Sequence, residues 1–128
     1  MSRSLTDDEL AFLRSVLDLA RQGRTDDLLA AVRAGVPVNL TSAAGDSLLI
    51  LAAYHDHPGT VAALLDAGAD PDRVNDRGQT ALGAAVFRRS RESVDALLAA
   101  GADPHAGERS AVDVAAFFGL SEYLDPVT

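Results

Sequence analysis

The sequence predicts an all-α solenoid, in which helix–turn–helix units joined by short β-hairpin-like loops stack within a single domain. The first observation is an internal repeat, because residues 64–71 recur as residues 97–104, 33 positions later, and both copies end in Gly-Ala-Asp-Pro. Such a period is typical of stacked repeats. The second is composition: 48% of the 128 residues are hydrophobic but only 5% are aromatic. A core of Ala, Leu and Val favours closely packed helices.

The repeat divides the domain into four units. We expect an N-terminal capping repeat over about 5–38, full repeats over about 39–71 and 72–104, and a truncated C-terminal capping repeat over about 105–128. A weaker copy of the Gly-containing segment lies at 31–37, displaced by the same interval from the copy at 64–70. The last unit begins at Ser110, three positions earlier than the repeat from Thr80 would place it, so its linker is shorter.

The first predicted helix covers about residues 6–22 and is longer than the others. Thr6 followed by Asp7, Asp8 and Glu9 is a capping pattern that places acidic groups at the positive end of the helix. Its apolar residues recur at helical spacing and should face the stack: Leu10, Leu13, Val16, Leu17 and Ala20.

The following units each read as a pair of helices. The first helices, at 48–53 and 81–86, follow hydroxyl residues that can accept from free amides of the first turn: Ser47 and Thr80, with Ser110 for the last unit. Second helices are expected at 27–34, 60–67 and 92–100, with Pro58 and Ser90 suited to starting two of them. Gly35, Gly68 and Gly101 stand where each should end. A polar arm then leads to a tight turn at 75–78.

The hairpin and helix pattern resembles the ankyrin repeat. The motif D-x-x-G-x-T-P-L-H-x-A-A is similar to residues 75–85 and 42–52, and the likeness extends over about 14–124. The motif's Pro is replaced by Leu48, Ala81 or Ala111, and its His by Ile50, Gly83 or Asp113. Because that His ties neighbouring loops together in the family, we expect these hairpins to be held less firmly. The last helix is reduced to about one turn, 121–124, before Asp125-Pro126, and should act as a cap.

The resemblance implies a non-catalytic module that binds a protein partner on a concave face formed by the hairpin tips and the first helix of each pair. In this sequence the expected contact residues are Ala43, Ala44, Asp46, Tyr54, His55, Asp76, Arg77, Gln79, Phe87 and Arg88. Phe117 and Phe118 take the corresponding places in the last unit.

Aromatic residues recur along this surface. Tyr54, Phe87 and Phe117 share one position in three successive units, so their rings should form a stripe that could anchor a partner. Alternatively the rings could fill gaps in an alanine-rich core. For Tyr54 and Phe87 both outcomes stay open, whereas for Phe117 and Phe118, near the end of the stack, we expect the core.

Composition and net charge argue against nucleic-acid binding, membrane insertion and secretion. A net charge of −8 works against nucleic acid. No apolar run is long enough to span a membrane, the chain has no cysteine, and its first residues lack the apolar core of a secretory signal. We therefore expect a cytoplasmic, monomeric protein without a cofactor. The use of Arg without Lys, with much Ala and Gly, suggests a GC-rich bacterial genome.

Two other functions stay open at this stage. His55, Asp56 and His57 could hold a metal, for a metal-binding protein or metal-dependent enzyme, although they supply at most three ligands from one loop. His57 also matches the His of the family's Gly-His pair, which serves the loop. The chain could instead be a structural subunit or self-associating scaffold. No nucleophile elbow, phosphate loop or zinc-protease motif is present.

Overall fold

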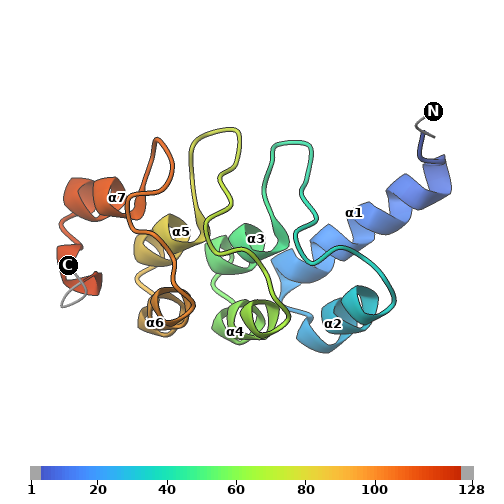
Figure 1. The fold of residues 1–128 in the computed structure, drawn as a ribbon, viewed down its shortest axis with the longest axis horizontal. Helices are drawn as coiled ribbons and strands as arrows, with labels where there is room; N and C mark the ends of the chain where they lie inside the picture. Colours follow the sequence, from blue (N-terminus) through green and yellow to red (C-terminus); the bar gives the residue numbers. More distant parts are fainter. Residues whose placement is uncertain (1–3, 125–128) are drawn as a thin grey trace.

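Helix pairs stack in a row in the computed structural model, which describes residues 4–124 (Figure 1). Across this range there are seven α-helices and one short 3₁₀ helix: α1 (Asp7–Gln22), α2 (Thr25–Arg33), α3 (Leu48–Tyr54), α4 (Pro58–Asp66), α5 (Ala81–Phe87), α6 (Arg91–Ala99), α7 (Ala111–Phe118) and η1 (Ser121–Tyr123). The inner layer contains α1, α3, α5 and α7, and the outer layer contains α2, α4 and α6. This arrangement confirms the all-α repeat solenoid. Residues 125–128, assigned above to the last unit, lie outside the described range.

The helices begin at the capping residues that the sequence predicted. Thr6 and Glu9 form a reciprocal capping box, in which the Glu9 amide donates to Thr6 Oγ1 at 3.1 Å and the Thr6 amide donates to Glu9 Oε1 at 3.0 Å. Ser47, Thr80 and Ser110 each accept from an amide three residues on, at 3.1–3.2 Å. Each cap of this kind contributes about 1 kcal/mol.

The second helix of each pair begins slightly earlier than predicted. Pro58 itself is the first residue of α4, and α2 and α6 likewise start one or two residues before the expected positions. All three end one residue before the expected end and are followed by glycine at positive φ, at Gly35, Gly68 and Gly101. Beyond Gly68, the Ala69 amide donates back to the Leu64 carbonyl at 3.0 Å, which closes the last turn.

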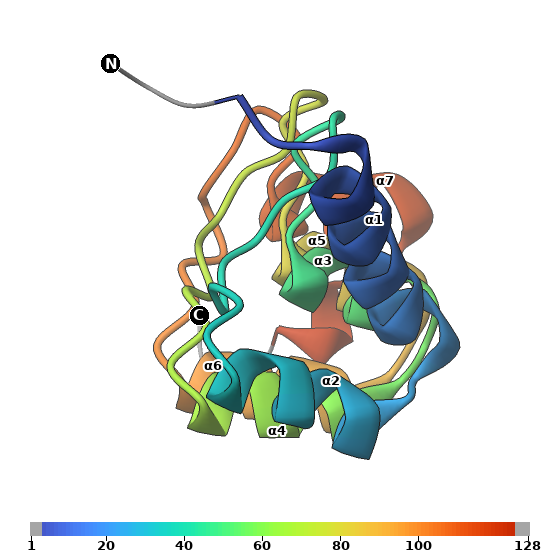
Figure 2. The same ribbon diagram turned by 90° about the vertical axis from the view of Figure 1, so that its right-hand side faces the viewer.

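The core lies between the two layers. Leu49 of α3 and Leu82 of α5, which occupy the same position in successive units, are each 1% exposed, and Leu64 of α4 is fully buried. Ala52 and Ala85 are fully buried between neighbouring inner helices, where a larger side chain would separate the backbones. The Ala/Leu faces therefore serve stacking, and Figure 2 shows that successive units superpose along the row.

The hairpins project from one side of the inner layer and are bonded to one another. Asn75 is buried: its Oδ1 accepts from the amides of Arg77 and Gln79, and its Nδ2 donates to Asp46 Oδ1 of the preceding hairpin at 2.7 Å. Backbone bonds add Asp76 N to Ala44 O at 3.0 Å. Within residues 4–124 these loops form isolated bridges but no strand. Asn75 therefore links adjacent loops without the family's histidine. That the hairpins are held less firmly than in the family stays a prediction.

Candidate binding groove

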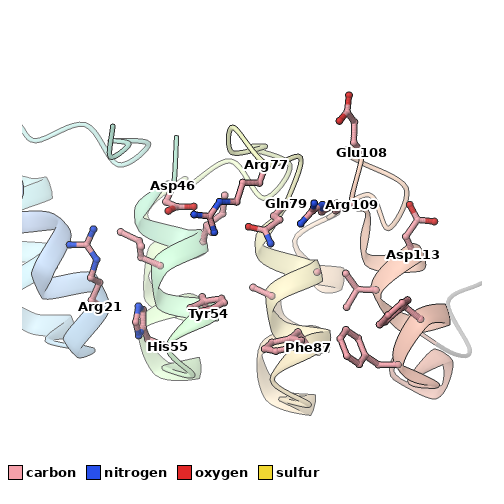
Figure 3. Close-up of a pocket in the computed structure, with 17 residues that line it drawn as sticks. Arg21, Asp46, Tyr54, His55, Arg77, Gln79, Phe87, Glu108, Arg109 and Asp113 are labelled. Carbon is pink, nitrogen blue, oxygen red and sulfur yellow. The ribbon is translucent and has the colours of Figure 1, made fainter. Parts of the chain in front are cut away.

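A groove of about 830 Å³ runs along the stack between the hairpins and the inner helices (Figure 3). Most of its lining comes from four positions that are equivalent in the three successive units. These rows are Asp46–Gln79–Arg109 at the hairpins, Ile50–Gly83–Asp113 and Leu51–Ala84–Val114 along the helices, and Tyr54–Phe87–Phe117 at the helix ends. Arg21, His55, Arg77, Glu108 and Phe118 complete it. Stacking thus converts sequence equivalents into continuous rows.

Aromatic rings form the lower wall of the groove. Tyr54 and Phe87 stack with their ring centroids 6.4 Å apart and their planes 5° from parallel. The Phe118 ring meets Phe87 edge to face at 5.4 Å, and Phe117 meets Phe118 at 4.9 Å. Tyr54 is 49% exposed, Phe87 39% and Phe118 44%. The rings therefore hold one another in place while keeping a face toward solvent.

The prediction for the two rings of the last unit was wrong. Phe117 and Phe118 were expected to join the core, but Phe117 is 82% exposed and Phe118 is also exposed. Phe117 lines the groove at the predicted position of the stripe, but its ring reaches Phe87 through Phe118, which contacts both rings. Helix α7 continues one residue further than α5, to Phe118, and ends at Gly119 in the left-handed conformation. Leu120 and Leu124, rather than the two rings, are buried at this end of the stack.

Charged side chains line the upper rim. Arg77 and Arg109 are exposed, and no acidic side chain among residues 4–124 forms an ion pair with either guanidinium. Among the acids of the rim, Asp46 already accepts from Asn75, and the carboxylate of Glu108 points away from the helices (Figure 3). The rim therefore presents two arginines with free donors.

Two histidines at the start of the groove have different environments. His55 packs edge to face on Tyr54, with centroids 5.4 Å apart, and partial burial together with nearby Arg21 lowers the pKa of its ring below 6.5. The His57 ring instead turns toward α1, where Nε2 lies 2.8 Å from the Arg21 carbonyl oxygen. No group of three His, Asp or Glu side chains in the described part of the chain could share a metal ion, and we find no support for the metal hypothesis.

Six of the ten predicted contact residues line the groove: Asp46, Tyr54, His55, Arg77, Gln79 and Phe87. The other four do not. Ala44 and Asp76 lie where neighbouring hairpins face each other, because the Ala44 carbonyl accepts from the Asp76 amide, and Ala43 is exposed outside the groove. Arg88 points instead to Asp56, 4.0 Å away.

The sequence prediction missed the helix positions along the floor, such as Gly83 and Ala84, and Arg109 on the rim. The repeat contains a signal for these positions. The residues equivalent to Ile50 and Leu51 in the next two units form the whole floor, and Arg109 is the residue of the last unit that is equivalent to Asp46. Those positions pass unnoticed because small and aliphatic side chains on a repeat helix are typical of core.

None of the helices in residues 4–124 combines the length and apolar character that crossing a bilayer requires. Within that range, paired helices, linked hairpins and an open groove of partly exposed rings define a helical-repeat scaffold. A family model of three ankyrin repeats matches residues 17–108. The chain therefore belongs to the ankyrin-repeat family, whose repeats generally serve as protein–protein interaction modules.

A relative from Pseudomonas aeruginosa, named as an ankyrin repeat protein, is 48% identical over 50 residues. The match covers 39% of this chain and 29% of the relative, so the chain spans less than a third of that protein's length. The similarity supports the family without extending to the rest of the relative.

Proposed function

We propose that the protein is a non-catalytic module that binds a protein partner in the groove between its hairpins and inner helices. The observation that carries this proposal is that the Phe87 ring contacts those of Tyr54 and Phe118, while all three stay 39–49% exposed. Clustered exposed aromatic side chains with a polar rim are typical of protein interfaces. Because neighbouring rings already restrain them, these side chains lose little rotamer freedom on binding.

The structural roles of several serine and histidine side chains support binding over catalysis. Ser47, Ser90 and Ser110 each accept from a helix amide, so their oxygens serve as caps. His57 is bonded to the backbone of α1.

We further propose that the protein acts as a cytoplasmic monomer. Size-exclusion chromatography with light scattering would detect a dimer, which would contradict the second point.

Affinity capture from an extract of the native cells tests the function. The double substitution Tyr54→Ala/Phe87→Ala should remove most of the captured partner, because both anchors are lost. Phe12→Ala is the matched control: Phe12 is 53% exposed on α1 and does not line the groove. Thermal melts of each variant would show whether the fold persists. Equal capture by the double variant and wild type would refute groove binding, as would loss only in Phe12→Ala.

A further inference from the structure

The floor of the groove is hollow at its centre. In the row Ile50–Gly83–Asp113 the middle unit contributes a hydrogen atom, and in the row Leu51–Ala84–Val114 it contributes a methyl group. The flanking units carry larger side chains at both positions. Gly83 and Ala84 therefore form the bottom of a depression, with Phe87 from the same helix on its lower side.

Packing does not require glycine at this position. A Cβ built on Gly83 would lie 3.5 Å from Thr80 Oγ1, 3.6 Å from the Arg109 carbonyl oxygen and 3.8 Å from Ala111 Cα, all ordinary contacts. Its φ is not in the positive range. A glycine inside a helix costs about 0.5–1 kcal/mol relative to alanine. The sequence therefore carries a residue that weakens the helix at the position where the groove lining has its smallest side chain.

Two exposed arginines line the groove beside the hollow. Arg77 and Arg109 lie on successive hairpins and, in the described residues, neither has an acidic partner. Figure 3 shows Arg109 directed back toward Gln79, over the groove. The acidic side chains that also line the groove, Asp46, Glu108 and Asp113, belong to the flanking units. Guanidinium groups bind carboxylates in a planar, two-bonded geometry, which an acidic partner would supply.

We propose that the occupant of the groove is an extended acidic segment of the partner protein, which inserts one apolar side chain over Gly83 and Ala84 and places carboxylates on Arg77 and Arg109. This binding mode rests on the function proposed above and specifies its partner. Stacked helices lie roughly 10 Å apart, which is about three residues of extended chain. The carboxylates should therefore lie within about three or four positions of the apolar anchor.

Selection from a phage-displayed library of random linear peptides, with the full-length chain as bait, tests the chemistry directly. We expect enrichment of peptides that combine Asp or Glu with one large apolar residue at this spacing. Enrichment of basic or uncharged peptides would overturn the inference, and so would no enrichment at all. Either result would leave groove binding intact if the ring variants still lose the cellular partner. Failure of those ring variants to lose the partner would count against the groove itself.

Fluorescence polarisation with one selected synthetic peptide then assigns each contact. Arg77→Glu/Arg109→Glu should weaken binding at least about tenfold. Arg14→Glu/Arg33→Glu is the matched control, since both arginines are exposed, make the same change in net charge and lie outside the groove. Equal losses in the two double variants would mean that only overall charge matters, which would overturn the proposed contacts.

Filling the hollow tests the anchor. Gly83→Leu should weaken peptide binding about tenfold or more, whereas Gly83→Ala should have a much smaller effect because its methyl group fits. Ala84→Leu, on a half-buried groove position, provides a second filling variant if Gly83→Leu does not fold. Unchanged affinity in a folded filling variant would overturn the assignment of the anchor.

Discussion

The contact between Gly23 and His57 provides the sharpest stability prediction. Gly23 ends α1 at φ +69°, and a Cβ placed there would lie 2.5 Å from His57 Nδ1. Gly23→Ala would therefore force the ring away and break the 2.8 Å bond between His57 Nε2 and the Arg21 carbonyl oxygen. The left-handed backbone costs about 1–2 kcal/mol, and the lost bond about 0.5–1.5 kcal/mol. With residual crowding, we expect a total loss of about 2–4 kcal/mol.

Two controls separate the backbone cost from the ring contact. Gly119 ends α7 at nearly the same φ, +68°, and a Cβ placed there would meet no atom within 4 Å, so Gly119→Ala should lose only about 1–2 kcal/mol. In a His57→Ala background, Gly23→Ala should fall to that same value. Urea unfolding followed by circular dichroism measures the free energies of unfolding of the wild type, the three single variants and the Gly23→Ala/His57→Ala double variant. Additive losses within about 0.5 kcal/mol would refute the ring contact.

Three further predictions concern single residues. The pKa of the His55 ring should lie below 6.5 in an NMR titration, because the folded protein disfavours the charged ring. The contribution of His55 to the free energy of unfolding should therefore be present above pH 6.5 and be lost as the pH falls through the lowered pKa. His55→Gln should remove that part of the pH dependence, and a titration midpoint at or above 6.5 would contradict the lowered pKa. Arg89 lies at φ +56° between α5 and α6, so Arg89→Gly should raise the unfolding free energy by about 0.5–1 kcal/mol in urea titrations; a loss would contradict backbone strain there. Leu82→Ala should cost about 2–5 kcal/mol in thermal and urea unfolding, since the side chain is 1% exposed, and a loss below about 1 kcal/mol would mean that the core reorganises.

Local chemistry explains why most of the fold could be predicted. The caps at Ser47 and Thr80 and the glycine after α4 act over three or four residues, so their positions in the sequence determine helix starts and ends. The regular spacing of the units then determines the stacking order. Pro58 was recognised as a possible start, yet α4 began two residues before the predicted range because the proline is itself the first helical residue.

The groove was only partly predictable because its shape depends on contacts between units. Phe117 and Phe118 are adjacent in sequence, and only the path of α7 decides which ring meets Phe87. Gly83 carries no side chain, so a search for binding residues by chemical type passes over it. Asp76 appeared at a hairpin tip as a free recognition residue, but in the structure its amide bonds the preceding hairpin.

Amide NMR of the full-length chain, titrated with the captured partner or a selected peptide, tests the groove most directly. Binding in the groove predicts shift changes in the hairpins at 75–79 and 106–110 and along α3, α5 and α7, with α4 and α6 nearly unaffected. Changes concentrated on α4 and α6 would contradict it, because those helices cover the opposite side of the inner layer (Figure 1).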